Sequence, residues 1–461
     1  MSGITQDWRC WCSSLVVASV LIASLQEHTF AQITPDNTLP NNSNVAKEGN
    51  IFNITGGTQA GSNLFHSFRE FSVPPGGTAS FNNAGDIQNI ISRVTGGSVS
   101  NIDGLIRAFG KANLFLINPN RIIFGKGARL NIGGSFVGTT ANAIGFGNQG
   151  FFSATNPNNP QLLTVNPSAF LFNQIAAAPI QNNSIASAGI DAAGYDAFGL
   201  RVPDGKSLLL VGGDVSMNGG QLNAYGGRVE LGGLSEPGTV ALGIDGDNLS
   251  LKFPENVART SVSLTNQAAI YVEAVGGGNI AVNAKNLNIL EGSILSAGIG
   301  EGLGTSKTVA GDITLNATGE IKVSSGSLVF NDVGAFNDVG FGSKGNGGNI
   351  TIDSGSFSLS DGAQLSASTF GQGNAGNVTV SAKDAVSLAG GQTTIFSRVE
   401  AGGVGKGGDI DINAATLSLI DGALLTASTF GQGNAGNVTV SAKDAVSLAD
   451  ADILSTVDSG G

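Results

Sequence analysis

Short apolar runs, separated by Gly, Asn and Pro, make up most of the sequence after residue 50. Residues 50–54, 87–94, 114–117 and 122–124 are clear examples. Runs of roughly four to eight residues with this punctuation are typical of β-strands. The Ala-rich stretch 176–200 is interrupted by Gly, Pro and Asn, and no segment after residue 31 keeps a helical period. We therefore expect an all-β protein.

Residues 207–233 have the most regular local pattern. Pairs of Gly occur at 212–213, 219–220, 226–227 and 232–233, with spacings of 7, 7 and 6 residues. Three short strands, each followed by a glycine corner, make a unit of about 20 residues, which is the size of one parallel β-helix coil. A meander of hairpins is the alternative, but its turns would favour Asn-Gly or Asp-Gly.

The second half of the chain repeats. Residues 361–389 recur at 421–449, and the two copies differ only where Gln364 and Ser366 become Leu424 and Thr426. A shorter motif, Gly-Asn/Asp-Ile/Val, starts at Gly278, Gly311, Gly348, Gly376, Gly408 and Gly436. One such unit cannot bury its apolar face alone, whereas stacked units share a continuous core. The repeats thus predict a solenoid. Because no polar cap follows them, we expect further repeats downstream.

The first 31 residues have the pattern of a secretory signal peptide. Arg9 precedes an eleven-residue apolar core at 15–25, and small residues at Thr29 and Ala31 predict cleavage between Ala31 and Gln32. A membrane-spanning helix would need roughly 20 apolar residues. We therefore expect an exported protein.

Composition narrows the functional classes. The chain of 461 residues has 70 Gly, 12% charged residues and a formal net charge of −12. This acidic balance disfavours nucleic acid and anionic membranes as partners, and the plentiful apolar residues disfavour disorder. Both Cys precede residue 32, and His66 is the one His after it. Thiolate zinc sites and His-based catalytic triads are therefore not expected.

Residues 65–125 carry a set of motifs in a defined order. Phe65, Phe68 and Phe71 fall in an F-x-x-F-x-x-F-x-V pattern, followed by FNN at 81–83 and ISRVTGG at 91–97. IDG at 102–104 and FLINPNRIIFG at 115–125 complete the set. The segment resembles the haemagglutination-activity domain, the amino-terminal secretion domain of filamentous-haemagglutinin-like exoproteins of the two-partner pathway.

The resemblance covers about residues 32–240 and implies a right-handed parallel β-helix with an amino-terminal cap. It also implies that a dedicated outer-membrane transporter with periplasmic docking domains recognises this domain unfolded. The protein would then be secreted through the periplasm to the cell surface or medium of a Gram-negative-type bacterium. Residues 241–461 would continue the β-helix in repeats and are expected to be truncated.

The family's NPNGI motif maps to Asn118, Pro119, Asn120, Arg121 and Ile122, with Arg121 in place of Gly. Its companion NPNL motif has no counterpart upstream, and residues 156–158 come too late in the chain to supply it. These departures leave the transporter subtype open. Because Asn-Pro-Asn is also a turn signal, the motif can shape a corner and carry transporter recognition at once. The candidate recognition residues are these five together with Phe65, Phe68 and Phe71.

Other motifs argue against an enzyme. G-x-G-x-x-G occurs at Gly145, Gly340, Gly371 and Gly431, but no helix follows, so nucleotide binding is not expected. The acids Asp361, Asp384, Asp421 and Asp444 are pairs of repeat equivalents, whereas a catalytic centre is normally unique. Asp361 and Asp421 precede Gly and indicate turns. The calcium-binding repeat lacks its Asp here, and we expect no metal and no cofactor.

The leading hypothesis is a non-enzymatic, rod-shaped surface protein for adhesion or surface attachment, with host-cell or surface glycans or neighbouring cells as partners. An extracellular β-helix carbohydrate-active enzyme is one alternative, and the stalk of a contact-dependent toxin without its effector end is another. The sequence shows neither an aromatic platform nor a charged pocket that would name the target.

Overall fold

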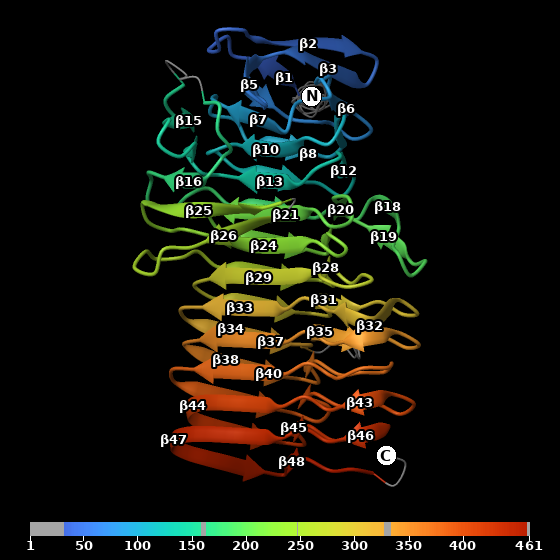
Figure 1. The fold of residues 1–461 in the computed structure, drawn as a ribbon. Coiled ribbons are helices and arrows are strands. Elements are labelled where there is room, and N and C mark those ends of the chain that lie inside the picture. Colours follow the sequence, from blue (N-terminus) through green and yellow to red (C-terminus); the bar gives the residue numbers. More distant parts are fainter. Residues whose placement is uncertain (1–31, 158–162, 247, 327–332, 459–461) are drawn as a thin grey trace, which may run out of the picture. The chain divides into compact units, whose positions relative to one another are not determined.

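The computed structural model describes residues 32–157, 163–246, 248–326 and 333–458. Over these ranges the chain forms strands joined by turns and bends, and no helix there is long and apolar enough to cross a membrane. Most strands pair in parallel with the strand one coil later, so the coils stack one on another from β5 to β48 (Figure 1). The predicted parallel β-helix with an amino-terminal cap is confirmed.

From β7 onward the coils contribute strands to three faces. The first face is a parallel ladder formed by β5 (Asn63–Phe71), β7 (Asn89–Val94), β10 (Asn113–Ile117), β13 (Phe136–Thr139), β21 (Ser207–Gly212), β24 (Arg228–Gly233), β29 (Asn279–Ala284), β33 (Ile313–Ala317), β37 (Ile350–Ser354), β40 (Val378–Ala382) and the first parts of β44 (Ile410–Ile420) and β47 (Val438–Ala449).

The second face runs beside it in the same order. It comprises β8 (Ser100–Ile102), β11 (Ile122–Phe124), β17 (Ile180–Asn182), β22 (Val215–Asn218), β27 (Val262–Thr265), β30 (Leu287–Leu290), β34 (Glu320–Ser324), β38 (Ser356–Ser360), β41 (Ala385–Ala389) and the remaining parts of β44 and β47.

The third face is interrupted once. Its first part holds β3 (Ile51–Gly56), β6 (Thr78–Phe81), β9 (Leu105–Ala108) and β12 (Arg129–Asn131). After the break come β20 (Leu200–Arg201), β23 (Gln221–Asn223), β28 (Ala269–Tyr271), β31 (Ile294–Ile299), β35 (Gly334–Val339), β39 (Gln364–Ser366), β42 (Thr394–Phe396), β45 (Leu424–Thr426) and β48 (Asp452–Leu454).

Antiparallel strands cap the first coil and cover one side of the helix. In the cap, β1 (Ile33–Pro35) and β4 (Thr58–Ala60) pair with β5, and β2 (Ser43–Glu48) pairs with β3. A separate sheet contains β14 (Ala143–Gly145), β15 (Phe151–Ser153), β16 (Ala169–Phe172), β25 (Gly238–Asp245) and β26 (Asn248–Lys252). A second apolar core, which includes Phe115, Val137 and Leu209 from the first face, lies beneath this sheet. The sequence pattern did not predict this covering sheet.

Short projections leave the third face. The hairpin of β18 (Ser187–Ile190) and β19 (Asp196–Phe198) interrupts it between β12 and β20. Lower in the stack, β32 (Gly304–Val309) pairs with β36 (Lys344–Asn346), and β43 (Val404–Lys406) pairs with β46 (Gln432–Asn434).

The glycine pairs at 207–233 lie at the corners, as predicted. Strands β21 and β24 begin and end this unit and pair in parallel, so the stretch is one coil. A Cβ atom on Gly227 would overlap the carbonyl oxygen of Lys206 in the coil before, and one on Gly233 would overlap that of Gly212. Glycine is required here because successive coils approach through bare backbone.

The repeated Gly-Asn/Asp motif forms a hydrogen-bonded ladder along the second half. The side-chain Oδ1 of each Asn or Asp accepts a bond from the backbone N–H of the equivalent residue in the next coil, at 2.8–3.0 Å. The participants are Asn279, Asp312, Asn349, Asn377, Asp409 and Asn437. This Asn/Asp ladder explains why the motif tolerates either residue but needs a side-chain carbonyl or carboxylate.

Candidate functional site

The three Phe residues of the F-x-x-F-x-x-F pattern lie on β5 and are buried in two different cores. Phe68 and Phe71 point into the β-helix interior, with ring centroids 5.2 Å apart. Phe65 points to the opposite side, where its ring lies 4.8 Å from Phe152 and 5.6 Å from Phe146 of the covering sheet. Phe65 and Phe68 are three positions apart and therefore point to opposite sides of the strand, so this pair fastens β5 to both layers.

A buried arginine connects the cap to the covering sheet. Arg93 on β7 is 1% exposed. It donates hydrogen bonds to the Ser67 hydroxyl (2.7 Å), the Thr38 hydroxyl (2.9 Å) and the backbone carbonyls of Ser153 (2.7 Å) and Pro157 (3.1 Å). Its guanidinium also lies 4.1 Å from the centroid of the Phe152 ring.

Asp36 completes this cluster, which we call the Arg93 network. Its carboxylate accepts hydrogen bonds from the hydroxyls of Ser67 (2.6 Å), Thr95 (2.6 Å) and Thr38 (2.8 Å). Burial alone would raise the pKa of Asp36, but these hydrogen bonds outweigh burial and lower it. Burial lowers the pKa of Arg93 to about 10, and the negative charge of Asp36 acts in the other direction by raising it. Arg93 therefore stays charged at neutral pH.

His66 lies in the main core of the cap. Its Nδ1 is 2.9 Å from the Ser43 hydroxyl, and its ring lies 5.3 Å from Phe81 and 6.0 Å from Phe68, centroid to centroid. Burial lowers its pKa to about 4, so the ring is neutral at pH 7. His66 is therefore a buried packing residue of the cap.

The Asn-Pro-Asn motif forms the corner between β10 and β11. Asn118 is fully buried and donates to the Ser98 carbonyl (3.0 Å) and the Ser100 hydroxyl (2.8 Å), while its Oδ1 accepts from the backbone N–H of Asn120 (2.9 Å). Asn120 is exposed, and its Nδ2 donates to the Gly96 carbonyl at 2.5 Å. Ile122 begins β11 and is buried. The motif therefore has a buried structural side and an exposed side.

Arg121 occupies a backbone conformation suited to Gly. Its φ is +134°, whereas the family motif has Gly at this position. Its Nη2 donates to Gln181 at 3.2 Å, but its buried Nε has no hydrogen-bond partner. The departure from the motif thus leaves the glycine-type backbone in place under a side chain that strains it.

The substitution Arg121→Gly should stabilise the protein. Glycine removes the backbone strain and also removes the buried Nε that has no hydrogen-bond partner. These two gains should outweigh the lost bond to Gln181, so we expect the protein to be more stable by about 1 kcal/mol. Thermal unfolding of both proteins measures it, with Arg129→Gly on the exposed strand β12 as the control that should lose stability. An unchanged or lower melting temperature for Arg121→Gly would contradict the strain argument.

The remaining sequence predictions lie elsewhere. Ala31 lies outside the described residues, while the carbonyl of Gln32 accepts a hydrogen bond from Ser72 N–H at 3.0 Å. Asp361 and Asp421 have φ of +58° and +57° and lie in turns, as their sequence context indicated. Among the described residues, no three His, Cys, Asp or Glu are placed to hold a metal ion.

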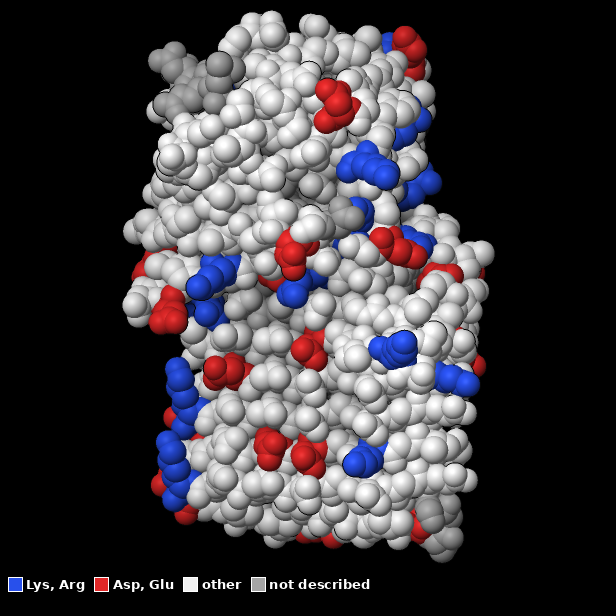
Figure 2. All heavy atoms as spheres, viewed as in Figure 1, with Lys and Arg blue, Asp and Glu red and all other residues white. Residues whose placement is uncertain are grey.

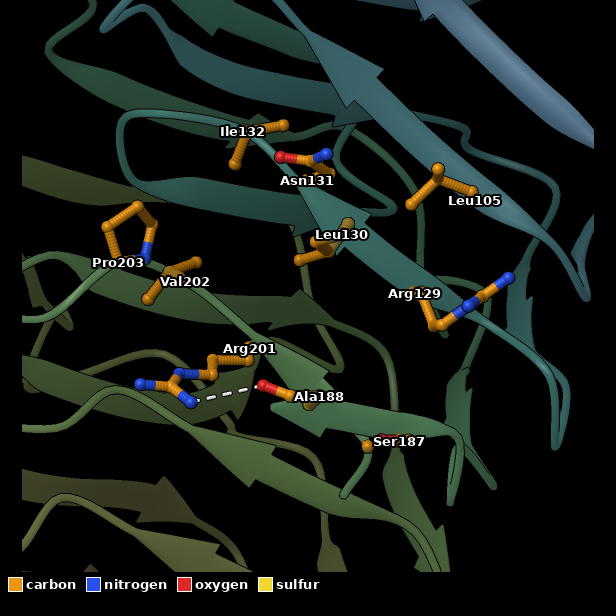
Figure 3. Close-up of a pocket in the computed structure, with 11 residues that line it drawn as sticks. Leu105, Arg129, Leu130, Asn131, Ile132, Ser187, Ala188, Arg201, Val202 and Pro203 are labelled. Carbon is orange, nitrogen blue, oxygen red and sulfur yellow. Dashed lines mark hydrogen bonds between the residues drawn. The ribbon is translucent and has the colours of Figure 1, made fainter. Parts of the chain in front are cut away.

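A cavity of about 390 Å³ lies at the break in the third face, and residues of β12, β18 and β20 line it. Figure 3 shows these lining side chains. β12 and β20 are each the edge strand of their sheet, and these two edges face each other across the cavity. Their Cα atoms nevertheless approach within 8 Å, and a strand inserted between them would need about 9.6 Å, twice the normal strand spacing. Arg201 faces the cavity but donates to the carbonyls of Ala188 and Ile190. The cavity is thus a packing gap below the hairpin.

A second cavity lies between the β18–β19 hairpin and the third face. It measures about 360 Å³ and contains Tyr195, Tyr225 and Tyr271, which are the three Tyr of the chain. Asp191, Asp196 and Glu273 also line it. These residues come from a hairpin and two successive coils, and no local sequence pattern links them. The expectation of neither an aromatic platform nor a charged pocket is therefore corrected here.

Charge is unevenly distributed along the chain. Between Asp103 and Asp191 there is no acidic residue, while Arg107, Lys111, Arg121, Lys126 and Arg129 all fall there. Figure 2 shows Lys and Arg side chains gathered along the right-hand edge of the upper coils. The overall net charge concealed this basic region.

Comparison with known proteins agrees with this architecture. The family model of the TPS secretion domain matches residues 31–282. The crystal structure of the HMW1 secretion domain from Haemophilus influenzae aligns with a TM-score of 0.59 at 20% sequence identity, covering 91% of this chain and 100% of that chain, so the two share a fold. Curated protein sequences give no match.

The matched region contains the β5 phenylalanines, the Arg93 network and the Asn-Pro-Asn corner. A TPS secretion domain implies export by a two-partner system, through its outer-membrane transporter, to the extracellular space or cell surface. Because the match covers more than half of the chain, this protein belongs to the TPS secretion domain family, the substrates of two-partner secretion.

Proposed function

We propose that residues 32–240 are the signal that the transporter reads and that the β-helix they begin, continued by residues 241–461, attaches the cell to a surface. The observation that supports this proposal is the match to the TPS secretion domain over residues 31–282. Cleavage between Ala31 and Gln32 would release the chain into the periplasm, where periplasmic docking domains of the transporter would bind it.

The burial of the recognition residues supports binding of an unfolded chain. Phe65, Phe68, Phe71, Asn118 and Ile122 are all buried. A transporter that reads these side chains must therefore meet them before the coils form. Folding outside the cell then hides the signal, which favours release of the chain from the transporter.

Expression in a Gram-negative host with and without the cognate transporter tests the export route. We expect the full chain in the medium or on the cell surface only when the transporter is present. Export at the same level without it would refute the transporter as the partner.

The exposed Asn120 separates recognition from stability. Asn120→Ala removes the side-chain bonds to Gly96 and Asn118, and we expect a loss of about 1 kcal/mol of stability and a severalfold fall in secretion. Secreted protein is quantified by immunoblot, and stability by thermal unfolding. Asn437→Ala is the matched control, because the exposed Asn437 also bonds to the preceding coil, through Asp409, but lies outside residues 32–240. Equal secretion by the two variants would leave Asn120 a structural role only.

Attachment is the second half of the proposal. The coils offer long repeated faces, and repeated weak contacts on one rod add up to strong binding. Glycans and neighbouring cells are the partners we propose for these faces. Binding of the purified chain to a glycan array and to intact cells tests this, and absence of binding to both would refute it.

A further inference from the structure

The cavity between the hairpin and the third face concentrates the aromatic hydroxyls of the protein. Its ten lining residues are Asp191, Tyr195, Asp196, Ala197, Phe198, Gln221, Asn223, Tyr225, Tyr271 and Glu273. The chain has three Tyr in 461 residues, and all three are among the ten residues that line this cavity, which would seldom happen by chance. We call this cavity the tyrosine pocket.

Backbone register and hydrogen bonds build the walls of the pocket. Asn223 on β23 is directly opposite Tyr271 on β28. The hydroxyl of the buried Tyr225 donates to Asn223 Oδ1 at 3.0 Å, and Asn223 Nδ2 donates to the Phe198 carbonyl at 2.5 Å. The amide of Asn223 thus ties the hairpin to the third face, so the pocket is formed without a ligand.

Tyr195 lies at the hairpin side of the pocket and is 58% exposed. Its hydroxyl donates to Glu301 Oε2 at 2.6 Å, which fixes the ring although the residue lies near the hairpin tip. Asp191 Oδ1 accepts from the backbone N–H of Ala193 (2.9 Å) and of Tyr195 (2.8 Å). The pocket therefore has a rigid rim as well as a rigid base.

Electrostatics selects the sign of a ligand. Three carboxylates line the pocket and no Lys or Arg does. Burial raises the pKa of Glu273, a hydrogen bond from the Ser296 hydroxyl opposes that rise, and the charge of Asp191 adds to it. A positively charged group in the pocket would relieve this repulsion.

The aromatic rings favour an organic cation over a metal ion. The Arg201 guanidinium lies 4.9 Å from the centroid of the buried Tyr225 ring and occupies one face of it, so Tyr195 and Tyr271 are the rings left for a ligand. Carboxylates suited to a metal ion do not cluster anywhere in the described chain. Aromatic rings combined with carboxylates are the recognised way to bind alkylammonium groups.

We propose that the tyrosine pocket binds an alkylammonium group, with the Tyr195 and Tyr271 rings contacting its methyl or methylene groups and Glu273 and Asp191 balancing its charge. This inference deepens the attachment role by naming a ligand class. It concerns the folded chain after export, so its failure would show in a binding assay and leave the secretion assays unaffected.

Titration of the purified full chain with tetramethylammonium chloride tests the proposal. We expect saturable binding by calorimetry, and quenching of tyrosine fluorescence, since all three Tyr lie in the pocket. Potassium chloride and methyl α-glucoside serve as the small-cation and neutral-sugar controls. Equal response to potassium, or binding of the glucoside in place of tetramethylammonium, would overturn the proposal.

Three variants locate the site. Glu273→Gln keeps the shape of the side chain and should weaken binding about tenfold, and Tyr271→Leu should weaken it about fivefold. Glu320→Gln removes an exposed carboxylate from the second face and should leave affinity unchanged. Thermal unfolding checks that each variant is folded. If Glu273→Gln is folded and binds as tightly as the parent, the pocket is not the site.

Two further ligands in the same binding assay identify the molecule that carries the ammonium group. Phosphatidylcholine vesicles present it on a lipid, and a trimethyllysine peptide presents it on a protein. Binding of either one supports the proposal and identifies the source. Binding of tetramethylammonium alone supports a free small-molecule ligand.

Discussion

Replacing Arg93 by Met is expected to destabilise the amino-terminal coils by about 3–5 kcal/mol. Met fills a similar volume but leaves the buried carbonyls of Ser153 and Pro157 without their donor. It also removes the positive charge that faces Asp36. The loss should be local, because the hydrogen-bond partners of Arg93 all belong to the cap, to β5 or to the segment of the covering sheet at Ser153 and Pro157.

Hydrogen–deuterium exchange read strand by strand is the suitable measurement, since stacked coils need not unfold in one step. Protection of β5, β7 and β15 should fall, while that of β40 and β44 should not change. Arg129→Met on β12 is the matched control, because Arg129 is exposed. A loss below about 1 kcal/mol for Arg93→Met would contradict the structural role of the network.

Acidification from pH 7 to pH 4 is expected to weaken the cap by up to about 3 kcal/mol through His66. The pKa of His66 is about 4 in the folded protein and 6.5 in the unfolded chain. Between these values the unfolded chain binds the proton and the folded protein does not. Stability is therefore full above pH 6.5 and falls as the pH drops toward 4.

His66→Phe should remove this dependence, because the ring volume is kept and the proton site is lost. Exchange of the β5 amides at pH 7, 5.5 and 4 measures the effect locally. A local readout is needed because burial raises the pKa of Asp338 on β35 to about 6, so that group stabilises its own coil as the pH falls from 6 toward 4. An equal pH slope in the variant and the parent would show that His66 is not responsible.

The sequence predicted what depends on local pattern. The Gly pairs of residues 207–233 indicated one coil, and β21 and β24 show it, because bare backbone at a corner is a local requirement. The motif starts from Gly278 onward likewise marked the coil period, which the strands β29 to β47 follow. The family resemblance then supplied the cap and the export route.

Features that join distant segments could not be predicted. The covering sheet pairs β16 with β25, some 70 residues later, through apolar runs that look like any other strand. Arg93 stood in a recognised motif, but nothing local marked it as buried. The tyrosine pocket was missed for the same reason, since its walls come from residues 191–198, 221–225 and 271–273.

The direction of the Asn/Asp ladder has a consequence for the order in which the coils form. Each coil that has already formed presents an oriented Oδ1 to the amide of the coil that follows, as Asp312 does for Asn349. A chain that folds from its amino terminus thus finds an ordered template at every step. The ladder therefore favours growth of the solenoid from the amino-terminal cap toward the carboxyl-terminal coils.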